Sequence, residues 1–185
     1  MKLFFYLPLL FILGMFFSCQ APAKETLDLS ETQNLIKSSY ENDILDQYFH
    51  LKDALASDDM KKVREVAKYF KNLSDNLYLS TDLKKSVSNE AIQSLRKLGT
   101  ISQEIIDAEN IQNQRIAFFK LSKYFSEALR NGEIINPNPE SKIYIQFCPM
   151  AFKNSGAIWM SSDYDIVNPY FGEVMLTCGV VRDSI

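Results

Sequence analysis

Four sulfur-bearing residues near the C-terminus are the side chains best suited to chemistry. Cys148 and Met150 lie two positions apart, and Met175 and Cys178 lie three positions apart. Thiolates and thioethers are soft ligands that suit Cu(I) and similar soft ions. Both spacings let the paired sulfur atoms face one point if the chain turns between them. Trp159 lies between the two pairs, and its ring is suited to cover a cation. The four residues therefore predict a low-coordinate soft-metal site.

The same residues are also compatible with purely structural roles. A Cys148–Cys178 disulfide would close a loop of about 30 residues, worth roughly 3–4 kcal/mol in the chain-entropy model. Methionines usually fill gaps in a core, and Trp159 would anchor one. Buried free thiols are a further alternative, and the chain has no Cys-x-x-Cys motif that would decide between them. A thiol-redox role is the least favoured, because nothing nearby would activate a thiol as that motif does at a helix start.

Composition and missing motifs exclude several classes of function. The 185 residues carry a formal net charge of −3, whereas a nucleic-acid binder needs a basic patch or stripe. His50 is the single histidine, so the chain lacks the residues for most histidine-based acid–base or zinc chemistry. We find no GxSxG, HExxH, phosphate-loop or EF-hand motif. We therefore expect a protein that is not an enzyme and does not bind nucleic acid.

The N-terminus is typical of an export signal. Lys2 precedes an apolar run from Leu3 to Phe17, which is short of the roughly 20 residues that a spanning helix needs. Cys19 follows this run in a pattern that resembles the lipobox of bacterial lipoproteins. The resemblance implies a signal peptide over residues 1–18 and acylation of Cys19. An uncleaved anchor and a plain secreted protein are the alternatives. In each case the folded part lies outside the cytoplasm, in an oxidising compartment.

The rest of the chain divides into a tether, a helical region and a C-terminal segment of different character. Residues 19–30 are polar and form a lipidated tether. Between residues 31 and 132, apolar side chains recur at steps of three or four, as on the buried face of a helix. We expect four helices, the first capped by Ser30 and the next two beginning near Met60 and Leu83. Gly99–Thr100 would separate the third helix from a long fourth one.

The fourth helix has polar residues within its apolar stripe. The stripe comprises Ala108, Ile111, Arg115, Phe118, Ser122, Phe125 and Leu129. A buried Arg115 would need a carboxylate or several carbonyls around it, because an unpaired buried charge is very costly. We expect Arg115 to be a polar tie between helices or to the C-terminal segment, in preference to a ligand-binding residue. Ser122, on the same face, is a second supporting residue.

Residues 133–185 form a β-rich cap that carries the cysteine and methionine motifs. Asn136–Pro139 cannot be helical and marks its start. Strands are expected over residues 143–147, 157–160 and 174–181, with turns at 154–156 and 168–172. Asn168, Tyr170 and Gly172 in the second turn are expected to support the site structurally. The cap is too small to be stable alone and should pack on the helices as part of one domain. The fold class is therefore mainly α: a four-helix bundle with a small C-terminal β-rich cap, α+β overall.

Several sequence strings together resemble a bacterial domain family of unknown function. In the cap they are Cys148-Pro149-Met150-Ala151, Gly156-Ala157-x-Trp159, Asn168-Pro169-Tyr170-Phe171-Gly172 and Met175-Leu176-x-Cys178-Gly179. In the helices they are Tyr48-x-x-Leu51-Lys52-x-Ala54-Leu55 and Arg115-x-x-Phe118-x-x-Leu121-Ser122. The resemblance covers roughly residues 40 to 182. That family occurs as free-standing lipoproteins and at the C-terminus of periplasmic adaptor subunits of copper/silver RND efflux pumps.

The resemblance implies a role in heavy-metal handling outside the cytoplasm. It gives weight to Cys148, Met150, Met175 and Cys178 as ligands of Cu(I) or a similar soft ion. We expect a lipoprotein of the outer membrane, facing the periplasm, that buffers the ion or transfers it to an efflux adaptor or another envelope protein. The alternative is a structural or interaction module of the envelope whose cap is closed by a Cys148–Cys178 disulfide.

Overall fold

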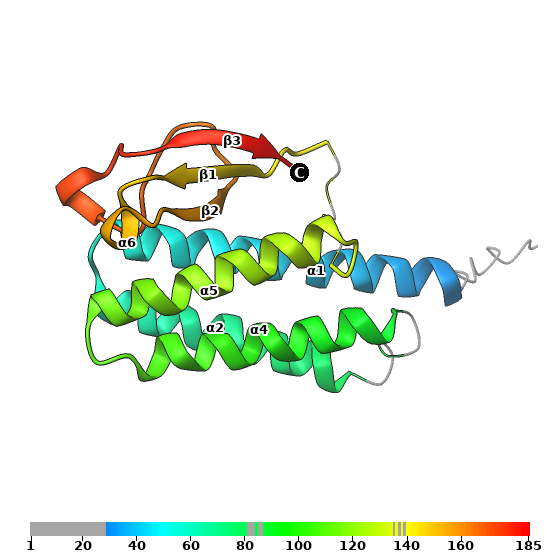
Figure 1. The fold of residues 1–185 in the computed structure, drawn as a ribbon. Helices are drawn as coiled ribbons and strands as arrows, with labels where there is room; N and C mark the ends of the chain where they lie inside the picture. Colours follow the sequence, from blue (N-terminus) through cyan, green and yellow to red (C-terminus); the bar gives the residue numbers. More distant parts are fainter. Residues whose placement is uncertain (1–28, 81–83, 85–86, 135, 137, 139) are drawn as a thin grey trace, which may run out of the picture.

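Four long helices and a small antiparallel sheet make up the computed structural model (Figure 1). It describes residues 29–80, 84, 87–134, 136, 138 and 140–185. The helices are α1 (Leu29–Ala56), α2 (Met60–Leu79), α4 (Asn89–Asp107) and α5 (Ile111–Arg130). The mainly helical α+β fold is confirmed. The predicted signal peptide, Cys19 and the predicted tether up to residue 28 lie outside the described residues. The structure places Ser30 inside α1, not before it.

The third and fourth helices differ from their predicted limits. α4 begins at Asn89, where the Ser88 side chain accepts a hydrogen bond from the Ala91 N–H. The predicted break at Gly99–Thr100 is wrong, because α4 runs through it to Asp107. An added Cβ at Gly99 would lie 2.6 Å from the Asp75 carboxylate, so this glycine allows α2 and α4 to approach closely.

The real break between these helices comes later. Ala108, predicted in the fourth helix, is the C-cap of α4. Asn110 then caps α5 by accepting a hydrogen bond from the Asn113 N–H. The sequence analysis placed the break at a glycine, but a glycine inside a helix costs only about 1 kcal/mol, which close packing offsets.

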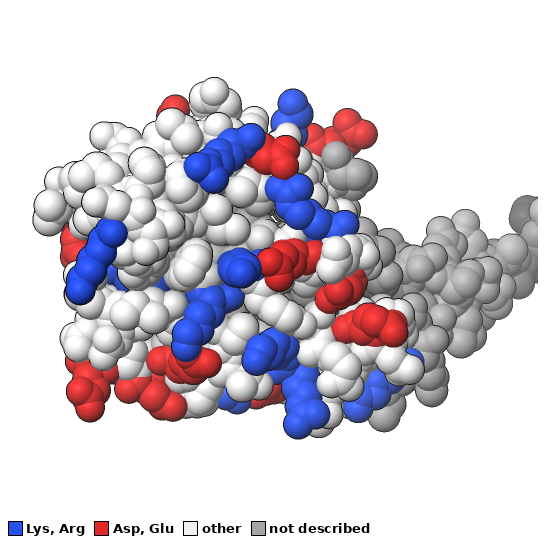
Figure 2. Space-filling model, in the orientation of Figure 1, with Lys and Arg blue, Asp and Glu red and all other residues white. Residues whose placement is uncertain are grey.

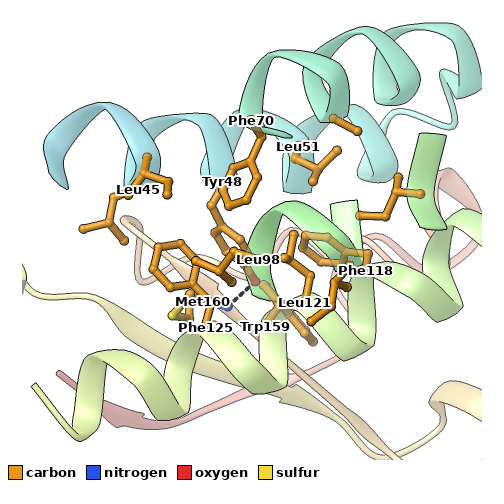
Figure 3. Packing of buried hydrophobic residues seen from close by; sticks show 14 of the residues in the cluster. Leu45, Tyr48, Leu51, Phe70, Leu98, Phe118, Leu121, Phe125, Trp159 and Met160 are labelled. Atoms are coloured by element: carbon orange, nitrogen blue, oxygen red, sulfur yellow. Dashed lines mark hydrogen bonds between the residues drawn. The ribbon is translucent and has the colours of Figure 1, made fainter. Parts of the chain in front are cut away.

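One hydrophobic core joins the helices to the cap. Tyr48 and Leu51 of α1, Phe70 of α2 and Phe118 of α5 are fully buried. Trp159 and Met160 of the cap are also fully buried and belong to the same cluster (Figure 3). The cap therefore packs on the bundle through side chains of its second strand.

The cap consists of a three-stranded sheet and two short helices. The strands are β1 (Tyr144–Cys148), β2 (Ala157–Ser161) and β3 (Val180–Ser184), in the antiparallel order β2-β1-β3. Helix α6 (Ala151–Asn154) follows β1, and the 3₁₀ helix η1 (Gly172–Met175) precedes β3. β2 packs against α5 and α1. β3 lies mostly exposed on the other side of β1.

The third strand was placed wrongly by the sequence pattern. It begins at Val180 instead of residue 174, and the preceding segment forms a loop that bonds to itself. The Asn168 N–H donates to the Leu176 carbonyl at 2.7 Å, and its side chain donates to the Cys178 carbonyl at 2.6 Å. Since these carbonyls are already bonded, they do not join the ladder of a sheet. The turn predicted at residues 154–156 is confirmed.

Charges of both signs cover the helical face shown in Figure 2, whereas the end of the cap with α6 and η1 is mostly uncharged. Among the described helices, none is both long and apolar enough to cross a membrane.

Candidate functional site

The fold brings Cys148 and Cys178 into contact. Cys148 ends β1, and Cys178 lies two residues before β3. The register of these antiparallel strands pairs Phe147 with Val180, so Cys148 lies next to the Cys178–Gly179 segment that leads into β3. The two Sγ atoms are 2.9 Å apart and both cysteines are free thiols. The sequence did not show whether the two cysteines lie next to each other, and the structure shows that they do.

The environment of the pair favours the protonated form of Cys178. The hydrogen bond with the Cys148 thiol, and then burial and the charge of Cys148, raise the pKa of Cys178 from 9.0 to about 11. Cys148 is fully buried, whereas Cys178 is half-buried. A ligand that needs thiolates must therefore displace a proton from Cys178 at neutral pH.

Each of the two methionines lies close to a cysteine in the chain, but the two differ in placement. Met175 ends η1, and its carbonyl accepts the Cys178 N–H at 3.1 Å. Met150 precedes α6 and is 47% exposed at the surface. Within the described part of the chain, no hydrogen bond links a methionine sulfur to either thiol. The structure thus joins the two cysteines and places the methionines in the adjoining turns.

Nitrogen and oxygen ligands do not gather around the thiols. The described residues contain no group of three or more His, Cys, Asp or Glu side chains that could hold a metal ion. His50 lies on the exposed side of α1. The donor set of the site is therefore two thiols, with thioethers in neighbouring turns.

Arg115 is the predicted polar tie. Its Nε donates to the Pro169 carbonyl at 2.8 Å, and its Nη2 donates to the Leu55 carbonyl at 3.1 Å. Nη2 also pairs with the Asp58 carboxylate at 2.6 Å. The guanidinium is buried, so these partners offset the cost of removing its charge from water. The side chain joins α5 both to the end of α1 and to the loop before η1.

Asp58 is the residue that the sequence analysis missed. Asp59 caps α2 by accepting a hydrogen bond from the Lys62 N–H. Asp58 instead adopts a left-handed backbone conformation, with φ of 57°, and turns back toward α5 and the cap. Its second oxygen accepts the Glu173 N–H at 3.0 Å. The stripe position of Arg115 implied a carboxylate or several carbonyls as partners, but sequence spacing does not say which residues supply them.

The other supporting residues also hold the cap in place. The Tyr48 hydroxyl lies 2.7 Å from the Ser122 hydroxyl and accepts the Met160 N–H at 3.1 Å (Figure 3). The Tyr170 hydroxyl donates to the Ile158 carbonyl. An added Cβ at Gly172 would lie 2.1 Å from the Asp58 carboxylate, so only glycine fits there.

Trp159 is a buried core residue whose ring contacts the chain next to Cys178. It is fully buried and packs edge-on against Tyr170, with ring centroids 5.8 Å apart. An added Cβ at Gly179 would lie 2.8 Å from the Trp159 ring, so the ring contacts the residue after Cys178. Its indole Nε1 is buried without a hydrogen-bond partner among the described residues.

Comparison with known proteins gives one match. A family model described as a protein of unknown function (DUF3347) matches residues 44–136. The match is 93 residues long (136 − 44 + 1), half of the 185 in the chain. It begins in α1 and ends before β1, so the cysteine motifs lie beyond it. No curated protein and no solved structure matches the chain.

Proposed function

We propose that this chain, which belongs to the DUF3347 family of proteins of unknown function, binds one soft heavy-metal ion, Cu(I), through Cys148 and Cys178. The observation that carries the proposal is the 2.9 Å separation of the two sulfur atoms. Residues 30 positions apart meet at one point, where two thiolates would need only a small movement to bind the same ion.

The donor set favours Cu(I) over zinc. Structural zinc sites take four ligands from cysteine, histidine and carboxylates. The described residues offer no such set around the thiols. Cu(I) is satisfied by soft sulfur ligands, and thioethers are acceptable partners. Met175, in the turn that leads to Cys178, supplies a third ligand after a local rearrangement of η1.

Met150 suits the transfer of the ion. Its side chain is 47% exposed and lies two residues after the buried Cys148. A soft ligand at the surface next to a buried thiol offers a first contact for an ion that moves between proteins. In this proposal the protein is a lipoprotein of the outer membrane that buffers copper and exchanges it with a heavy-metal efflux adaptor or another envelope protein.

Proton release sets the pH dependence of binding. Because the pKa of Cys178 is about 11, each bound ion displaces a proton from this thiol at neutral pH. The apparent affinity should therefore rise about tenfold per pH unit from Cys178 alone, up to that pKa. Oxidation of the pair would abolish binding, since a disulfide offers no thiolate.

The second candidate function also rests on the sulfur contact. The same two thiols are placed to form a disulfide, which would tie the end of β1 to the segment before β3. In an oxidising compartment such a bond would stabilise the cap of an interaction module. The two candidates differ in the redox state of the protein isolated from cells.

Anaerobic native mass spectrometry of the reduced chain from Gln20 onward, with and without one equivalent of Cu(I), tests the proposal. We expect one retained copper, lost in Cys148→Ser and in Cys178→Ser. Met175→Leu should weaken retention, whereas Met160→Leu, a matched change in the buried core, should not. If both cysteine variants retain copper like the wild type, the site is wrong. No copper, with a two-dalton loss of mass in air, would establish the disulfide instead.

A further inference from the structure

We infer that a cavity between α5, α6 and η1 binds a small amphipathic monocarboxylate, a function separate from the cysteine pair. The cavity has a volume of about 730 Å³. This volume falls within the roughly 300–1,000 Å³ of small-molecule sites. Cys148 and Cys178 do not line it, although Met150, the proposed surface ligand for ion transfer, does.

The wall of the cavity is mainly apolar. Phe152, Tyr170 and Phe171 contribute aromatic surface, and Ile111 of α5 faces them. Phe152 and Tyr170 pack edge to face, with ring centroids 5.4 Å apart. Val174 of η1, which also lines the cavity, is 82% exposed. Apolar side chains on the rim and in the wall would cover the hydrocarbon body of a ligand.

Arg115 supplies a donor for an anion. The residue is only 2% exposed, yet it lines the cavity. Its Nε and Nη2 are occupied by two carbonyls and Asp58, whereas Nη1 has no hydrogen bond to any described residue. Nη1 is therefore available to donate to a ligand, and hydrogen bonds that involve a charged group contribute more than neutral ones. A ligand carboxylate would accept a charge-assisted hydrogen bond from Nη1.

The charges around the cavity favour one negative charge on the ligand. Asp58, Arg115 and Lys153 are the charged residues that line it, for a formal total of +1. Lys153 is exposed and forms no ion pair with a described residue. The lysine is thus available at the mouth to attract a carboxylate.

The backbone of this wall is strained. Phe152, Lys153 and Asn154 are consecutive non-glycine residues with φ of 51°, 57° and 68°. A left-handed conformation is unfavourable for most non-glycine residues, and such residues cluster at ligand clamps and active sites. The strained turn directs Phe152 and Lys153 to the cavity that they line.

Titration of the chain from Gln20 onward with octanoate and with 4-phenylbutyrate tests the inference. Calorimetry measures affinity, and the fluorescence of Trp159, which contacts the cavity residue Tyr170, reports occupancy. We expect one molecule bound per chain and at least tenfold weaker binding of octylammonium. The carboxylate that binds more tightly shows whether the cavity prefers an aliphatic or an aromatic ligand. Failure of both to bind, or equal binding of octanoate and octylammonium, would overturn the inference.

Four variants locate the binding. Lys153→Gln should weaken octanoate about fivefold, the effect of losing one exposed charge. Lys68→Gln, the same change on the exposed side of α2 and away from the cavity lining, should have no effect. Val174→Asp places a negative charge on the rim and should weaken octanoate further. Cys178→Ser should leave octanoate binding intact. Equal effects of the two lysine variants would place any binding elsewhere.

Discussion

The helical bundle and the C-terminal cap are held by different kinds of interaction. The helices bury periodic apolar stripes, and hydrogen-bonded caps begin α2, α4 and α5. The cap has three five-residue strands, and the outermost, β3, is mostly exposed. Most of the left-handed backbone positions among the described residues also lie in the cap. The helices are therefore held mainly by apolar packing within the shared core, whereas the cap also depends on hydrogen bonds to the bundle.

Two buried polar side chains of the bundle form hydrogen bonds with backbone groups of the cap. Arg115 binds the Pro169 carbonyl, and Tyr48 accepts the Met160 N–H. Each holds a backbone group of the cap at a fixed point. Because three short strands with one covered face are only marginally stable, losing such a tie should disturb the cap before the helices.

The largest effect is expected from Arg115→Met. The change removes a guanidinium with three partners and leaves the Asp58 carboxylate and two carbonyls without their donor. Breaking a buried pair costs about 3–5 kcal/mol, and the partly exposed Asp58 argues for about 3 kcal/mol. Urea unfolding measures the loss. Arg96→Met, on the exposed side of α4, should change stability by less than about 1 kcal/mol. Equal stability of the two variants would mean that Arg115 does not hold the cap.

The second largest effect is expected from Tyr48→Phe. The variant keeps the ring in the core but leaves the buried Met160 N–H unpaired and removes one partner of the Ser122 hydroxyl. The expected loss of unfolding free energy is about 2 kcal/mol. Hydrogen exchange should show faster opening of β2 than of α2. Tyr69→Phe, at a 58% exposed position, is the matched control. Uniform loss of protection across helices and strands would contradict the division between the two regions.

A smaller effect is expected from the protonation of Cys178. Its pKa is raised from 9.0 to about 11, so the folded state holds this proton more tightly than the unfolded chain. The stabilisation is complete below pH 9 and is lost as the pH rises toward 11. Unfolding midpoints of the reduced wild type should thus fall over this range relative to Cys178→Ser. Tyrosines and lysines titrate in both proteins, so the test is the difference between the two unfolding midpoints at each pH. Parallel pH profiles would show that the thiol contact is not formed in solution.

The smallest effect is expected from Asp183→Asn. Arg130, at the end of α5, donates to Asp183 of β3 at 2.7 Å, and this hydrogen bond lowers the pKa of the carboxyl. Both side chains are exposed, so water and salt screen the pair. The unfolding midpoint should barely move, and the remaining difference should vanish in high salt. A large, salt-independent loss would show that a surface ion pair, and not the buried ties, secures β3.

Sequence periodicity was sufficient to predict most of the helical bundle. Stripes such as Phe118, Ser122 and Phe125 predicted both the helices and the faces that they bury, because a helix repeats its neighbours every three or four residues. The polar stripe position of Arg115 also predicted a tie. Local rules failed at Gly99, where packing of α4 against α2 outweighed the low helix propensity of glycine.

The cap was less predictable, since its conformation depends on contacts between distant segments. The pattern from residue 174 to 181 resembles a strand, yet Asn168 bonds the Leu176 and Cys178 carbonyls and turns the chain into a loop. The left-handed run from Phe152 to Asn154 contains no glycine, which is the residue that would have predicted this backbone conformation. No local signal assigned Asp58, because its partner lies 57 residues away.

The amino-acid sequence by itself determined the class of the fold, the division at residues 133–136 and the four sulfur residues as a set. Only the tertiary structure decided that the two thiols meet at 2.9 Å while the Met150 side chain lies exposed in the adjoining turn. It also decided that Arg115 lies between a carboxylate and an open cavity. The physical reason is that periodicity along a chain reports which face is buried, whereas the partners on that face are set by packing and hydrogen bonding between segments far apart in the sequence.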